Sequence, residues 1–225
     1  FLLVKLPKIM SDAPKGSYSK ALRNKVVLKG SVGIFLYVGA EVAIGSYLVN
    51  YFLDMNLVES IRNSTFMNSI ASVFTGSNLM EIDGKAVVGS FVFIYWGGAM
   101  LGRFVGSYLT RVFLPKKVLG SFAILAITMI VLSMSTSGLF SMFAILFVGF
   151  FNSIMFPTIF TLTLEGQGDL KPRISGLLCT AIFGGAIISP AFGGLTDFAG
   201  FKLAFILPIV CYTYIWWFAR SKQLK

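Results

Sequence analysis

Long apolar runs without an ionisable side chain are the feature that most constrains how this chain can fold. Several of them reach about 20 residues, the length that an α-helix needs to cross the hydrocarbon core of a bilayer. Only 12% of the residues are charged and 56% are hydrophobic, whereas a soluble domain carries roughly a quarter charged residues. We therefore expect an all-α bundle of transmembrane helices.

These runs divide the chain into six expected membrane spans. Their boundaries are placed at residues 26–52, 86–113, 117–135, 139–164, 174–198 and 202–219. Together they predict one transmembrane bundle over residues 26–220, preceded by a basic linker at 1–25 and followed by a tail at 221–225. The long connection at 54–85 is mostly polar with partial helical periodicity, which fits either a short interfacial helix or a plain loop.

Lysine and arginine residues set the expected orientation of the spans. Of the 19 present, 16 fall on one side of the predicted bundle, whereas Arg62, Lys85 and Lys202 fall on the other. The positive-inside rule assigns the rich side to the cytoplasm, so both ends are predicted to be cytoplasmic in a bacterial inner membrane. Topology thus explains the net charge of +10, and no nucleic-acid partner is expected.

The residue types present limit the chemistry that the chain can perform. The sequence contains no histidine, which removes Ser-His and Cys-His nucleophile pairs and histidine-bound metal sites. Cys179 and Cys211 lie in apolar stretches without the spacing of a disulfide or metal site. We therefore predict a protein that is not an enzyme and holds no metal or organic cofactor.

Glu41 is the residue that fits a lipid environment least well. It follows Lys29 by 12 residues, which at about 1.5 Å per residue places it about 18 Å along the helix, near the bilayer midplane. Inserting a carboxylate at this depth costs roughly 3 kcal/mol. Tyr37 and Gly45 lie one turn to either side and share its face. We expect Glu41 and Tyr37 to line a substrate cavity; a structural hydrogen bond between helices is the alternative.

Asn152 is a second polar residue predicted at mid-depth, in the fourth span. Pro157 follows it and lacks the N–H that would bond to the carbonyl of Ser153, so a kink or local unwinding is expected here. Broken helices at this depth form binding sites in transporters. Asn152 is therefore a candidate cavity residue, although a kink that serves only packing is the alternative. Pro190 is expected to kink the fifth span.

Aromatic and basic side chains complete the candidate site. Trp96 and Phe156 lie at depth, where aromatic faces could stack on a sugar ring, although core packing is the commoner use of such residues. Arg103 and Arg111 form a basic inner edge on the second span. Either they anchor the topology by snorkelling, which the sequence favours, or they form a gate that pairs with carboxylates.

Four segments of the chain carry a recognisable pattern, and they are Tyr37–Tyr51, Tyr95–Ser107, Gly149–Phe160 and Gly193–Asp197. Together they resemble the fucose–galactose–glucose:proton symporter family of the major facilitator superfamily, and within it the glucose/galactose permeases. Their Phe-Pro-Thr-Ile-Phe and Gly-Arg-x-x-Gly sequences are the most specific features. The similarity extends from about Lys25 to Arg220.

The resemblance implies twelve helices in two bundles, with the sugar bound between them and each bundle built from two inverted three-helix repeats. The six spans here would form the C-terminal bundle. The expected partners are then a hexose, the lipid bilayer, and either the missing N-terminal six-helix half or another copy of this chain. In the fucose permeases the proton-coupling carboxylate lies in the other half, so Glu41 is expected to accept hydrogen bonds from sugar hydroxyls.

The sequence therefore predicts half of a secondary active transporter for glucose, galactose or fucose, working by alternating access with H⁺ or Na⁺ as the coupling ion. Two alternatives stay open. One is a non-transporting remnant or self-pairing six-helix module, and the other is a permease for another solute. The chain begins with Phe1 rather than methionine, which suggests a fragment, and alone it is not expected to transport.

Overall fold

The structure is a computed structural model that describes residues 21–76 and 80–221, so most of the predicted linker and tail lies outside the described residues. Every element in this part of the chain is helical, which confirms the all-α prediction. The elements are α2 (Lys25–Asp54), α3 (Leu57–Asn63), α4 (Thr65–Thr75), α5 (Gly84–Gly89), α6 (Val92–Val112), α7 (Pro115–Ser135), α8 (Gly138–Asn152), α9 (Met155–Leu164), η1 (Gly168–Leu170), α10 (Lys171–Thr180), η2 (Ala181–Phe183), α11 (Gly184–Ala204) and α12 (Ile206–Ala219).

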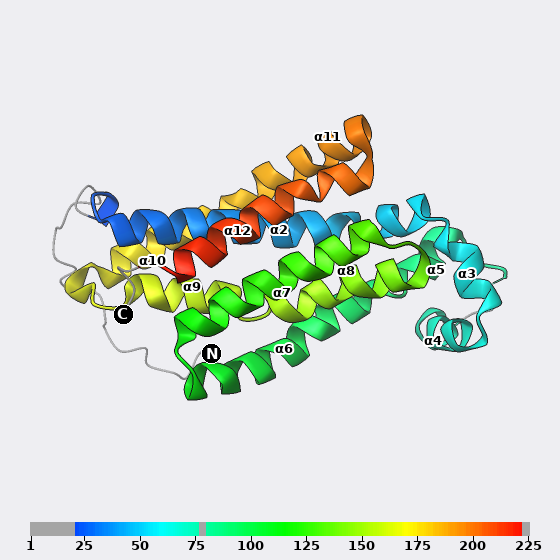
Figure 1. Cartoon of the computed structure of the whole chain (residues 1–225), viewed down its shortest axis with the longest axis horizontal. Helices are drawn as coiled ribbons and strands as arrows, with labels where there is room; N and C mark the ends of the chain where they lie inside the picture. The colour runs from blue at the N-terminus through cyan, green and yellow to red at the C-terminus, as the bar shows by residue number, and fades with distance from the viewer. Residues whose placement is uncertain (1–20, 77–79, 222–225) are drawn as a thin grey trace, which may run out of the picture.

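The long helices lie side by side and run roughly along the long axis of the molecule (Figure 1). Among the described residues, five helical stretches are long and apolar enough to cross a membrane, and α12 is a shorter sixth apolar helix. Gly200 has φ 79°, a left-handed conformation that favours glycine. The chain reverses direction at Gly200, within the bounds of α11. The last residues of α11, after Gly200, therefore already run in the direction of α12.

Helix α2 lies at the centre of the bundle, where it packs against α9, α11 and α12, while α8 packs between α6 and α7 (Figure 1). The side chain of Asn24 caps the start of α2 by accepting from the backbone N–H of Val26 at 2.9 Å, which satisfies one of the free donors at the helix N-terminus. In the middle of α2, Tyr37 and Ala40 are therefore buried in the core, whereas Glu41 is only partly buried.

Glycines allow two of the helix pairs to approach closely. A Cβ at Gly102 would collide with the backbone carbonyl of Phe150 and the side chain of Ser153, so α6 can lie against α8 only because this position has no side chain. A Cβ at Gly184 would likewise collide with the backbone of Phe35 on α2. Small residues serve the same purpose in other membrane bundles.

The fourth span is broken close to mid-length, between the end of α8 at Asn152 and the start of α9 at Met155. This break lies just before Pro157, where the sequence predicts a kink. In the fifth span α11 continues through Pro190 with helical backbone angles, and a bend at this residue stays a prediction. The 3-10 turn Ala181–Phe183 precedes α11 in the same span.

The predicted external connection at 54–85 is largely helical where the structure describes it. Helices α3, α4 and α5 gather at one end of the bundle (Figure 1). Asn56 begins α3 in a left-handed conformation with φ 53°, and the side chain of Ser64 caps α4 by accepting from Met67. Of the two expected forms of this connection, a plain loop is therefore wrong.

Candidate functional site

Glu41 lies near the middle of α2 and is half-buried, in a cavity of about 330 Å³. The other residues lining this cavity are Tyr37, one turn away on α2, Arg103 from α6, and Phe156 with Pro157 from α9. Three elements distant in sequence thus bring together five of the residues predicted to act in binding, gating or helix kinking.

The cavity combines opposite charges with an aromatic face. Glu41 interacts electrostatically with Arg103, and the Tyr37 side chain lines the cavity beside it. The ring of Tyr37 lies 6.4 Å from that of Phe156, and Phe156 stacks on Phe160 at 5.9 Å. A carboxylate and a guanidinium beside an aromatic surface can bind both the hydroxyls and the apolar face of a small polyol.

A second cavity of about 440 Å³ adjoins the first, because Arg103 and Pro157 line both. Its other polar lining residues carry hydroxyl groups and include Ser107, Thr158 and Thr161. The sequence reasoning missed these residues. The signal that could have found them is the pair of threonines in the turn that follows Pro157, on the helix already expected to be broken.

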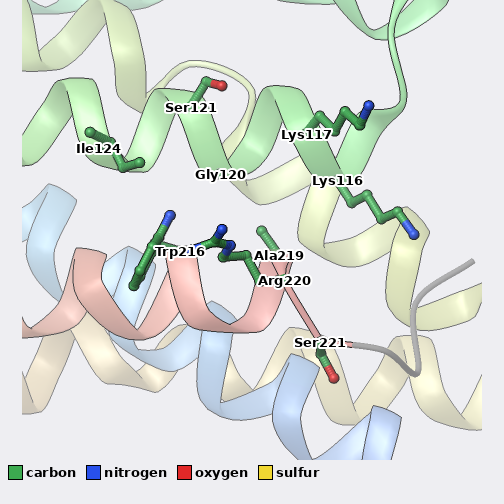
Figure 2. Close-up of a pocket in the computed structure, with 9 residues that line it drawn as sticks. All are labelled: Lys116, Lys117, Gly120, Ser121, Ile124, Trp216, Ala219, Arg220 and Ser221. Carbon is green, nitrogen blue, oxygen red and sulfur yellow. The ribbon is translucent and has the colours of Figure 1, made fainter.

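A larger cavity of about 680 Å³ lies apart from Glu41, between α7 and α12 (Figure 2). The nine residues that line it carry basic but no acidic groups. Among the described residues, no group of three or more His, Cys, Asp or Glu could hold a metal ion. The one cavity that contains a carboxylate at mid-span is therefore the better candidate for substrate binding.

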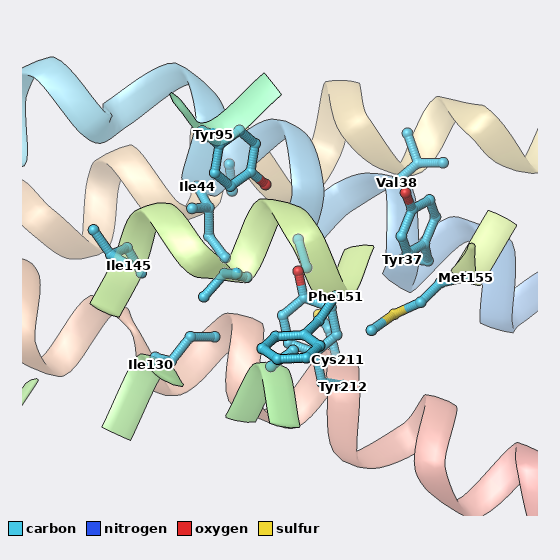
Figure 3. Packing of buried hydrophobic residues seen from close by; sticks show 14 of the residues in the cluster. Tyr37, Val38, Ile44, Tyr95, Ile130, Ile145, Phe151, Met155, Cys211 and Tyr212 are labelled. Carbon is cyan, nitrogen blue, oxygen red and sulfur yellow. The ribbon is translucent and has the colours of Figure 1, made fainter. Parts of the chain in front are cut away.

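Asn152 lies behind the Glu41 cavity, and the structure does not bring its side chain to the cavity wall. It is fully buried, its Nδ2 donates to the Tyr95 hydroxyl at 2.8 Å, and its Oδ1 accepts from the Tyr212 hydroxyl at 2.7 Å. Its backbone carbonyl, at the helix break, accepts from the Tyr37 hydroxyl at 3.0 Å. Asn152 thus links α2, α6, α8 and α12 at one point of the core. Figure 3 shows its three tyrosine partners, Tyr37, Tyr95 and Tyr212, among the buried residues of this core.

Trp96, Arg111 and Pro190 do not line the Glu41 cavity either. Trp96 packs over Gly45, one turn from Glu41, and is 51% exposed, so it lies beside the cavity on the same face. Arg111 is exposed near the end of α6. Pro190 lies within α11 and is not among the residues that line this cavity.

No family model matches the chain, whereas individual relatives do. It is 40% identical to a glucose/galactose transporter of Brucella abortus over 218 residues, which cover 96% of this chain and 47% of that protein. It is 39% identical to a putative glucose/galactose transporter of Helicobacter pylori over 223 residues, with 96% and 49% covered. It is 29% identical to the L-fucose-proton symporter of Escherichia coli over 231 residues, with 99% and 47% covered.

The fold has a solved counterpart as well. The structure superposes with a TM-score of 0.77 and 28% identity on the crystal structure of FucP, a major facilitator superfamily transporter in the outward conformation. The match covers 97% of this chain and 49% of that one. The chain thus spans about half the length of the curated relatives that it matches.

Proposed function

Because this chain belongs to the major facilitator superfamily, with glucose/galactose and fucose transporters among its relatives, we propose that it supplies one six-helix bundle of a cation-coupled hexose transporter. The observation that carries this proposal is the Glu41 cavity, a carboxylate at mid-span beside Tyr37, Arg103 and Phe156. A buried carboxylate inside a membrane bundle is expensive and generally marks a substrate or ion pathway.

Glu41 would accept hydrogen bonds from the hydroxyls of the hexose. Its interaction with Arg103 would orient the carboxylate, while Arg103 could donate to a further hydroxyl or to the ring oxygen. Phe156 would supply the apolar surface on which the ring packs. The hydroxyl groups of Thr158 and Thr161 in the adjoining cavity would extend the polar path toward one end of the bundle.

The Glu41 cavity is only partly enclosed by residues of this bundle. Transport would therefore require a second group of helices that forms the opposite wall of the cavity. We propose that this wall is a preceding six-helix half, as the twofold length of the relatives suggests, with alternating access produced by rocking of the two bundles. A second copy of this chain is the rival partner, and it would have to use the same face on both copies.

Uptake assays test this proposal directly. Vesicles containing only this chain should not accumulate labelled glucose, galactose or fucose. The chain joined behind the first six helices of the Brucella abortus relative should accumulate a hexose, and excess unlabelled hexose should compete where a carboxylate solute does not. A protonophore or replacement of sodium would identify the coupling ion. Accumulation by the chain alone, or competition only by a non-sugar, would contradict the proposal.

A further inference from the structure

The cavity between α7 and α12 is independent of the Glu41 cavity and has no role in the proposed hexose binding. It is lined by Lys116 and Lys117 at the start of α7 and by Trp216 and Arg220 near the end of α12 (Figure 2). Its volume of about 680 Å³ exceeds that of the cavity around Glu41. It is large enough for a phosphate group and the first atoms attached to it.

Among the described residues that line this cavity, three are cationic and none is acidic. Lys117 and Arg220 are exposed, and the Arg220 guanidinium is held over the ring of Trp216 at 4.8 Å from its centroid. This cation–π contact limits the conformations of Arg220, so less ordering is needed when an anion binds.

The start of α7 supplies a second reason to expect an anion. Positive charge is unfavourable at a helix N-terminus because the helix dipole and the free backbone N–H groups already make that end positive. Yet Lys117, which is exposed, lies in the first turn of this 21-residue helix, which has no acidic residue in that turn and no side-chain cap. A bound anion would offset this unfavourable concentration of charge.

The cavity is also amphipathic along its length. The lysines line one end of it and Ile124 lines the other, about two turns deeper along α7, while the Arg220 guanidinium over Trp216 lies between them (Figure 2). Gly120 and Ala219 lie between these ends and leave room between the two helices. A free phosphate would use only the basic end, whereas a phospholipid could place its phosphate there and its glycerol and upper acyl chain against Ile124.

We propose that this cavity binds a phosphate group, and that its source is the headgroup of an anionic phospholipid. The site lies on the side of the bundle that the distribution of lysine and arginine predicts to be cytoplasmic, and basic pockets between transmembrane helices are suited to such headgroups. The basic residues here would then recognise a lipid in addition to setting the topology of the chain.

Native mass spectrometry of the purified chain in detergent tests the proposal. The probes are phosphatidylglycerol, phosphatidylcholine and inorganic phosphate, each added to the unmodified chain, to Lys117→Gln/Arg220→Gln and to Arg111→Gln/Lys171→Gln. The last variant removes the same charge from the same predicted side but outside this cavity. Lys117→Arg/Arg220→Lys, which keeps both charges, shows whether a loss reflects charge or misfolding.

The unmodified chain should retain phosphatidylglycerol in preference to phosphatidylcholine. Lys117→Gln/Arg220→Gln should weaken this binding by about thirtyfold, the factor for two cations that each contribute about 1 kcal/mol. Arg111→Gln/Lys171→Gln and the charge-preserving variant should bind nearly as well as the unmodified chain. Equal losses in both Gln variants, no preference between the two lipids, or displacement of phosphatidylglycerol by equimolar inorganic phosphate would each overturn the proposal.

Discussion

Replacing Asn152 with alanine separates a structural role from a sugar-binding role for this residue. The substitution removes both side-chain hydrogen bonds, to Tyr95 at 2.8 Å and from Tyr212 at 2.7 Å. The backbone carbonyl that Tyr37 uses is retained. Tyr95 and Tyr212 are fully buried, so water cannot replace the lost partner.

The cost of this substitution follows from the number of bonds removed. Hydrogen bonds between helices in membrane proteins contribute about 0.6 kcal/mol on average and about 1.7 kcal/mol at most. Losing two of them should lower the free energy of unfolding by about 1–3 kcal/mol. Tyr212→Phe removes one of these bonds and should cost about half as much. Tyr95→Phe removes the other bond together with a long 3.5 Å bond from the Tyr95 hydroxyl to the backbone carbonyl of Glu41, so it should cost slightly more. The Asn152→Ala/Tyr212→Phe double variant should cost less than the sum of its parts, because the two changes remove a shared bond.

Unfolding of the purified chain by denaturing detergent, followed by circular dichroism, measures these differences. Asn50→Ala is the matched control, because Asn50 is an exposed asparagine on α2, and it should change the free energy by less than about 0.5 kcal/mol. If Asn152→Ala lowers the free energy of unfolding no more than this control does, and both Tyr→Phe variants are neutral, then the hydrogen bonds of Asn152 do not stabilise the core. The side chain would then be free to contact a sugar.

Two further predictions concern helix packing and the outer end of the bundle. Gly102→Ala should lower the free energy of unfolding by about 1–3 kcal/mol, because the added Cβ meets backbone atoms of α8; Gly97→Ala on the same helix has open space and should be neutral or slightly stabilising. Nitroxide labels at Val73, which is 77% exposed on α4, should be more accessible to oxygen than to a water-soluble nickel chelate in vesicles, and labels at Glu59, an exposed charged residue of α3, should show the reverse. Equal effects of the two alanines, or equal accessibility at the two labels, would contradict these expectations.

The sequence allowed the layout of the bundle to be predicted because the relevant signals are local. A span needs only a sufficient run of residues without charge, and the break before Pro157 follows from one missing backbone donor. Glu41 stood out because its distance from Lys29 gives its depth directly. Each of these inferences depends on neighbouring residues of one helix.

The partners of Asn152 could not be predicted in the same way, because they come from other helices. Tyr95 and Tyr212 lie 57 and 60 residues away along the chain. Only the packing of α6 and α12 around α8 brings their hydroxyl groups to the amide. The same packing decides that Asn152 is covered by protein while Glu41 faces a cavity, although both were predicted at similar depth.

Pro190 shows a second limit of local reasoning. A proline removes one backbone hydrogen bond, but a bundle can tolerate the free carbonyl without a break in the helix. Here the backbone angles stay helical at Pro190, whereas the helix is interrupted at the turn Ala181–Phe183 and at Gly200. The position at which a helix is interrupted depends on the contacts of the whole helix with its neighbours, and for α11 mainly on its contacts with α2.

The affinity for hexose of the joined transporter, measured with Glu41 changed to Gln and to Ala, tests the central claim most directly. Charge-assisted hydrogen bonds contribute about 1.5–3 kcal/mol, so Glu41→Ala should weaken hexose binding by about 10- to 150-fold and abolish accumulation. Glu41→Gln should weaken binding less, because its amide oxygen still accepts a hydrogen bond. Ser69→Ala, on α4 at the outer end of the bundle, is the control and should bind normally. Unchanged affinity and uptake in both Glu41 variants would show that the cavity around Glu41 is not the sugar site.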